Sequence, residues 1–114
     1  MNIKETITFE DFAKLDIRVG EIIDVFKFEK AKKPAYKLEI DFGEDIGIKK
    51  SSAQITEHYT KEDLIGKQVL AVVNFPVKNI AGFQSEVLVL GTYSEGGVVL
   101  VVPERKVKNG DILG

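Results

Sequence analysis

The chain has 114 residues, of which 44% are hydrophobic and 30% are charged, with no Cys and a net charge of −2. These values indicate one folded domain and exclude wholesale disorder, a disulfide framework and a thiolate metal site. The net charge argues against a strongly basic nucleic-acid binder. No apolar run approaches the ~20 residues of a membrane span, and residues 1–6 lack the apolar stretch of a signal peptide. We therefore expect a cytoplasmic protein without a membrane span.

The first predicted element is a short helix over residues 8–15. Thr8 is a suitable N-cap, and Asp11 stands three positions later as a weak capping-box partner. Three apolar residues then fall on one side of this helix: Phe9, Phe12 and Leu15.

Three strands are predicted next. A long strand begins at Ile17, and its apolar phase breaks at Gly20, which predicts a β-bulge and a bend there. Residues 36–42 alternate between apolar and polar without a fault. A turn over residues 43–45 leads into a third strand over residues 46–50.

The second half changes character. Residues 51–65 lack a long strand pattern, and Thr60 with Asp63 repeats the capping pair, so one or two short helical turns are expected. Three apolar strand-like runs follow: residues 68–75, 86–91 and 98–102.

This order of elements predicts an all-β fold, a five-stranded Greek-key barrel of the OB type, with short helices and extensions at both ends. A bent first strand favours closure of so small a sheet. We expect a single domain over residues 1–114, with a core of about residues 10–102 and a C-terminal extension over residues 103–114.

Catalysis is poorly supported. His58 is the single imidazole, and the sequence offers it no orienting partner. One His and no Cys leave only carboxylates as metal ligands, and none has ligand-loop spacing. No phosphate-binding Gly-rich loop is present. We expect no enzymatic activity, no metal and no cofactor.

A cluster of lysines follows the first strand, offset only by Glu29: Lys27, Lys30, Lys32, Lys33 and Lys37. Such a loop is either a solubilising surface or a phosphate-contacting surface at the rim of the barrel. Lys49 and Lys50 at the end of the third strand would extend the same basic surface.

Residues 74–86 join two strands and are too apolar for an ordinary solvated loop. Four residues carry this character: Phe75, Val77, Ile80 and Phe83. They either cover one end of the barrel or a second subunit, or they form an apolar groove for an extended peptide or a stacked base.

Several motifs resemble the tRNA-binding domain family: residues 16–22, residues 66–69, Asn74, residues 81–83 and the pair Ser85-Glu86. Within that family, residues 46–56, 72–76 and 80–91 are most similar to its export-related chaperones. The resemblance covers residues 10–114.

The resemblance implies an OB-fold, a homodimer and no enzymatic activity. It also implies binding of unfolded preproteins, of the secretion motor ATPase and of tRNA. The alternative is a free-standing tRNA-binding protein that assists tRNA handling. A structural adaptor that binds neither ligand is the third hypothesis.

Three sets of site residues are predicted. The peptide-binding set is Asn74, Phe75, Ile80, Phe83, Ser85 and Glu86. The RNA-binding set is Arg18, Lys32, Lys33, Lys37, Lys49, Lys50, Lys78, Ser85 and Leu88. The dimer interface is expected at Phe9, Phe12, Leu15, Val107 and Ile112.

Overall fold

The structure, a computed structural model, describes residues 2–114 and is built on a five-stranded antiparallel sheet. Its strands lie in the order β3-β2-β1-β4-β7, and the two edge strands β3 and β7 lie against each other. The sheet is therefore a nearly closed barrel, and the predicted OB-type topology is confirmed. The strand bounds are β1 Ile17–Lys27, β2 Tyr36–Asp41, β3 Ile48–Ala53, β4 Gln68–Val72 and β7 Leu88–Val89.

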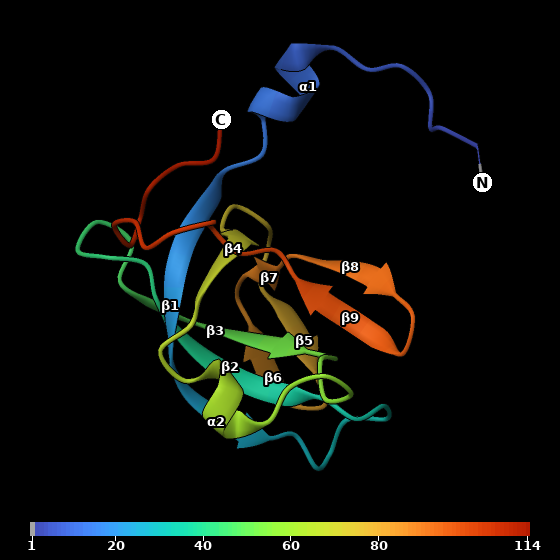
Figure 1. Cartoon of the computed structure of the whole chain (residues 1–114), viewed down its shortest axis with the longest axis vertical. Helices are drawn as coiled ribbons and strands as arrows, with labels where there is room; N and C mark the ends of the chain where they lie inside the picture. Colours follow the sequence, from blue (N-terminus) through green and yellow to red (C-terminus); the bar gives the residue numbers. More distant parts are fainter. Residues whose placement is uncertain (1) are drawn as a thin grey trace.

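Two hairpins and two short helices are added to this barrel (Figure 1). One hairpin, β5 Lys78–Ile80 with β6 Phe83–Ser85, lies within the connection between β4 and β7. The other, β8 Gly91–Ser94 with β9 Gly97–Leu100, projects from the side of the barrel. The helices are α1 Phe9–Ala13 and α2 Lys61–Leu64.

Both helices begin where the sequence predicts. Thr8 and Thr60 are the N-caps, and each forms a complete capping box with the Asp three positions later. Each box satisfies backbone N–H groups that the first helical turn leaves unpaired. The confirmed helix starts show that these elements are specified locally.

The interior of the barrel is apolar. Ile22, Leu38, Ile40 and Phe42 come from the strands or their ends, and Leu64 of α2 joins the same cluster. All five side chains are almost fully buried. A four-residue helix is thus held to the barrel through one leucine.

The predicted bulge at Gly20 is wrong in position. Gly20 pairs regularly with Val69, and the register shift of β1 lies between Ile22 and Asp24. A Cβ at position 20 would lie 2.6 Å from a methyl carbon of Ile40. Glycine is therefore needed at position 20 for close packing inside the barrel rather than for an extra residue in the strand.

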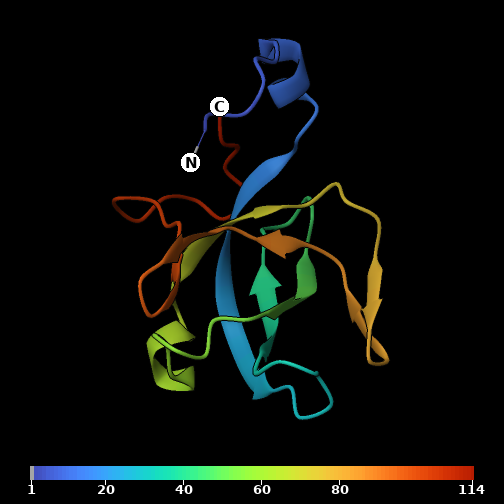
Figure 2. The ribbon, with the colours of Figure 1, turned by 90° about the vertical axis from the view of Figure 1, so that its right-hand side faces the viewer.

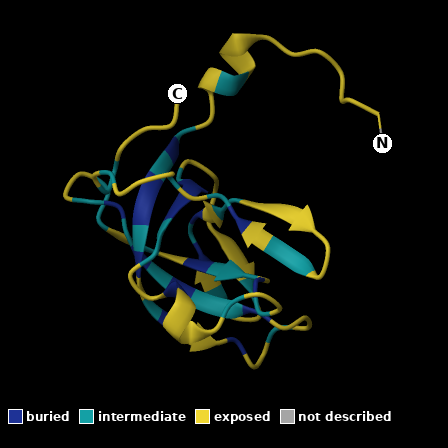
Figure 3. Ribbon diagram, in the orientation of Figure 1, coloured by how far each residue is buried: buried dark blue, intermediate teal, exposed yellow. Residues whose placement is uncertain are grey.

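A second apolar cluster lies outside the barrel. It consists of Ile17, Val19, Leu70 and Val72, and it is partly covered by Phe12, Leu90, Val101 and Val107. Figure 3 shows the buried strands of the barrel in contrast to the exposed α1 and β8. The covering residues come from the N-terminal segment and from the chain after β7, so both ends of the domain lie over this face.

The connection over residues 74–86 contains a hairpin that the sequence interpretation did not anticipate. Its turn is Ala81-Gly82, both with positive φ. Alanine is not the residue that usually signals such a turn, which explains why the hairpin was missed. Figure 2 shows the hairpin standing beside the barrel. None of the helices within residues 2–114 is long and apolar enough to cross a bilayer.

Candidate functional site

Ser85 and Glu86 lie where the barrel closes between β3 and the end of the β5–β6 hairpin, a place we call the seam. The Ser85 hydroxyl accepts a hydrogen bond from the backbone N–H of Ser52 at 3.1 Å. A carboxylate oxygen of Glu86 accepts from the backbone N–H of Lys50 at 3.0 Å. The Glu86 N–H in turn donates to the Lys50 carbonyl at 2.8 Å. These side chains thus replace part of a regular strand ladder.

A buried hydroxyl completes the seam. Ser51 is fully buried, and its Oγ donates to the Val87 carbonyl at 2.9 Å. The Lys49 ammonium lies 4.0 Å from the Glu86 carboxylate. Three of the predicted ligand-binding residues, Ser85, Glu86 and Lys49, therefore make contacts that hold β3 to the end of β6 and the segment between β6 and β7.

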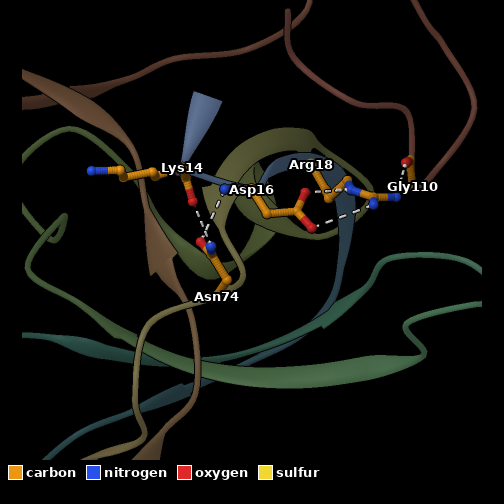
Figure 4. A network of polar contacts seen from close by, with 5 residues as sticks. All are labelled: Lys14, Asp16, Arg18, Asn74 and Gly110. Carbon is orange, nitrogen blue, oxygen red and sulfur yellow. Dashed lines mark hydrogen bonds and ion pairs between the residues drawn. The ribbon is translucent and has the colours of Figure 1, made fainter. Parts of the chain in front are cut away.

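Asn74 lies at a different place, where the N-terminal arm (residues 2–15) joins the barrel (Figure 4). Its Oδ1 accepts from the backbone N–H of Asp16 at 2.9 Å, and its Nδ2 donates to the Lys14 carbonyl at 2.8 Å. The neighbouring Val73 N–H donates to the Asp16 carbonyl at 2.8 Å. Both ends of the Asn74 amide are therefore used to fix the chain on either side of Leu15.

Arg18 continues this network toward the C-terminal tail. Its guanidinium pairs with the Asp16 carboxylate at 2.6 Å and donates to the Gly110 carbonyl at 3.1 Å. The hydrogen bond with Asp16 raises the pKa of Arg18 above its ordinary value. Arg18 also pairs with Ile112 through an isolated β-bridge. The network therefore joins the arm, β1 and the tail.

Lys37 and Phe83 come together in an open depression of about 340 Å³ beside the loop over residues 28–35, which we call the aromatic pocket. Phe28 and Phe83 meet edge to face, with ring centroids 5.5 Å apart. The Lys37 ammonium lies 5.1 Å from the centroid of Phe28 and 5.5 Å from that of Phe83. Lys27 and Lys30 complete the basic side of the pocket.

Phe28 is the principal residue that the predicted sets missed. It follows the long first strand within the lysine cluster, and its side chain is only 4% exposed. A single aromatic residue inside a basic loop was the available signal. Its partner Phe83 lies 55 positions away in sequence, so the pairing itself has no local signature.

The remaining predicted peptide and RNA residues are mostly exposed. Phe75 lies just after β4, Lys78 on β5, and Leu88 on β7. Lys32 and Lys33 lie in the loop over residues 28–35, outside the lining of the aromatic pocket. Ile80 is half-buried and pairs with Phe83 in the hairpin, and Lys50 is exposed on β3. The predicted peptide residues are thus divided among the seam, the Asn74 network, the hairpin and the end of β4.

The predicted dimer residues lie on two segments, the N-terminal arm and the C-terminal tail. Phe12 and Val107 pack against the outer apolar cluster, whereas Phe9 and Ile112 are largely exposed. In Figures 1 and 2 the arm extends away from the barrel. The exposed side chains of Phe9 and Ile112 therefore provide apolar surface on the two segments that the Asn74 network joins.

His58 is exposed, and its Nε2 lies 3.3 Å from the Glu95 carbonyl in the turn of the β8–β9 hairpin. Within residues 2–114, no group of three or more His, Asp or Glu side chains is placed to hold a metal ion.

The family model for the putative tRNA-binding domain matches residues 17–112. The chain belongs to this family. It is 38% identical over 110 residues to the methionine–tRNA ligase of Archaeoglobus fulgidus. The aligned region covers 96% of this chain but only 16% of the ligase. The tRNA-binding domain is thus a small part of those curated relatives.

Two solved structures match this tRNA-binding domain over their whole length. One is the CsaA chaperone protein from Picrophilus torridus, with 55% identity and a TM-score of 0.92. The other is the chaperone CsaA from Bacillus anthracis, with 51% identity and a TM-score of 0.90. Each alignment covers 96% of this chain and 100% of the other.

Proposed function

We propose that this protein is a non-catalytic cytoplasmic chaperone that binds unfolded or pre-export polypeptides and the secretion motor ATPase. The observation that supports this most is the end-to-end match with two chains described as CsaA chaperones. The match with the ligases, in contrast, is confined to a small part of those enzymes.

The surface around the end of β4 has the properties that such binding requires. Phe75 and Val77 follow β4 and are 45% and 55% exposed, and Leu88 pairs with the last residue of β4 and is 48% exposed. In the described part of the chain, β5 is paired only with β6. An extended polypeptide would pair with the outer edge of β5 through its backbone and place apolar side chains against the exposed ones.

The test is fluorescence anisotropy with a labelled unfolded peptide. Phe75→Ala is expected to weaken binding about fivefold or more, because exposed aromatic anchors carry much of the energy of such contacts. Tyr93→Ala is the matched control, since Tyr93 is an exposed aromatic residue on the other hairpin. Binding should persist in high salt. Equal losses in both variants, or binding that disappears with salt, would contradict the proposal.

We further propose that two copies associate through the arm. Phe9 is 77% exposed and Ile7 66%, and both lie on a segment that extends away from the barrel. A second copy that covers these side chains would bury apolar surface in a symmetric interface. Sedimentation equilibrium should give a dimer for the wild type and a monomer for Phe9→Asp. A wild-type monomer at micromolar concentration would refute this.

The second candidate function is tRNA binding, which the family match and the basic loop favour. Phosphate contacts release counterions, so tRNA affinity should fall steeply with salt. The double variant Lys32→Glu, Lys33→Glu should weaken tRNA binding and leave peptide binding unchanged. Equal loss of both ligands would mean that one surface binds both.

A further inference from the structure

The aromatic pocket combines an apolar part and a basic part. Its apolar part is the pair of rings, Phe28 and Phe83, and its basic part is Lys27, Lys30 and Lys37. Glu29 is the single acidic residue in its lining. The pocket therefore brings two aromatic rings, of which Phe83 is the more exposed, and an excess of positive charge together at one place.

Among the described residues, Lys37 forms no ion pair with an acidic side chain. Within residues 2–114, none of the ion pairs involves Lys37, Lys27 or Lys30. The Lys37 ammonium instead lies over the faces of both rings. Ring faces attract a cation through their quadrupole but leave it free to pair with an anion. An anionic group at the mouth of the pocket would find this ammonium in place.

The turn that carries Phe83 is strained. Ala81 has a φ of 49°, the one positive value for a non-glycine residue within residues 2–114. The left-handed conformation is unfavourable for alanine, and strain of this kind tends to persist where a site requires it. Asn79 stabilises the turn by accepting the Gly82 N–H at 2.9 Å. The turn lines the pocket and directs Phe83 toward Phe28.

We propose that the aromatic pocket binds one unpaired nucleotide of a single-stranded RNA, with the base against the Phe83 ring and the phosphate against the Lys37 ammonium. This inference rests on the proposed RNA binding and names the part of the RNA that is recognised. An aliphatic side chain would satisfy the rings and leave three ammonium groups without partners. Paired bases in a duplex do not expose their faces and could not reach the rings.

Charge and stacking make separable contributions, so two variants test them. Phe83→Leu keeps an apolar side chain but removes the ring face, and it should weaken binding of a labelled hexa-adenylate RNA about fivefold or more. The salt dependence should stay unchanged. Lys37→Gln should weaken binding and also lower the slope of log K against log salt by about 0.7, the value for one phosphate of a single strand.

Lys61→Gln is the matched control. Lys61 also lies over a ring, that of Phe26 at 5.9 Å, but on α2 and outside the pocket. This variant should bind the hexa-adenylate RNA like the wild type. Thermal melting of each variant should show that the fold is retained.

The outcomes separate the pocket from the RNA-binding function. If whole tRNA binds but Phe83→Leu and Lys37→Gln leave hexa-adenylate binding unchanged, the pocket assignment is wrong and RNA binding stands. If neither RNA binds the wild type, both are wrong. If Phe83→Leu weakens unfolded-peptide binding and spares RNA, the pocket is a polypeptide site, and the proposal is overturned.

Discussion

Replacing Asn74 by alanine should destabilise the protein rather than remove a ligand contact. The amide of Asn74 makes two hydrogen bonds, 2.9 Å from the Asp16 N–H and 2.8 Å to the Lys14 carbonyl. At about 0.5–1.5 kcal/mol each, with Asn74 itself exposed, the expected loss is about 1–2 kcal/mol. With a urea m-value of about 2 kcal/mol per molar, the unfolding midpoint should fall by roughly 0.5–1 M.

Asn74→Asp makes this prediction sharper because its shape is nearly the same. At neutral pH a carboxylate oxygen would face the Lys14 carbonyl, so this variant should be less stable than Asn74→Ala. Facing a carbonyl raises the pKa of the new carboxyl, so the defect should be full at neutral pH, shrink as the pH falls toward about 4, and be absent below the ordinary aspartate pKa of about 4. Urea unfolding at both pH values measures this. If Asn74→Ala keeps wild-type stability and loses peptide binding, Asn74 is a ligand residue and the reasoning fails.

Three further predictions concern the barrel and its helices. Gly20→Ala should lower the unfolding free energy by about 1–3 kcal/mol, because its Cβ would lie 2.6 Å from Ile40; an unchanged urea midpoint would contradict the packing explanation. Ser51→Ala removes the buried donor of the seam and should cost about 1–3 kcal/mol in the same assay, whereas Thr92→Ala on the exposed β8 should cost little. The backbone hydrogen bond of Thr60 lowers the pKa of Asp63, so the capping box should lose its stabilising effect as the pH falls below about 4. Asp63→Asn should remove this pH dependence of the unfolding free energy. A variant whose stability changes with pH as that of the wild type does would contradict this explanation.

The local elements were well predicted from sequence. Both capping boxes depend on residues three positions apart, and the alternation over residues 36–42 depends on nearest neighbours, so each signal lies within one segment. The OB-type topology followed from the order of these segments. The bulge was predicted at the wrong position because Gly20 is required by close packing against Ile40, which is distant in sequence.

The candidate site was predicted less completely than the fold, because its contacts also join residues that are distant in sequence. The sequence identified Ser85 and Glu86 through the family motif, but their contacts with β3 show that they close the barrel. Asn74 stood out as a strand-end residue, yet its partners lie about 60 positions earlier in the chain. None of these partners is visible in a pattern of neighbouring residues.

The sequence by itself determined the strands of the barrel, the capped helices, the basic loop and the membership in a family, but not the β5–β6 hairpin. Those features depend on hydrophobic alternation, on capping within one turn and on composition, which act over a few residues. Only the tertiary structure decided that Phe28 and Phe83 share Lys37, that the Ser-Glu pair closes the barrel, and that Asn74 fixes the arm. Each of these depends on side chains brought together by sheet closure, a long-range event that no short segment encodes.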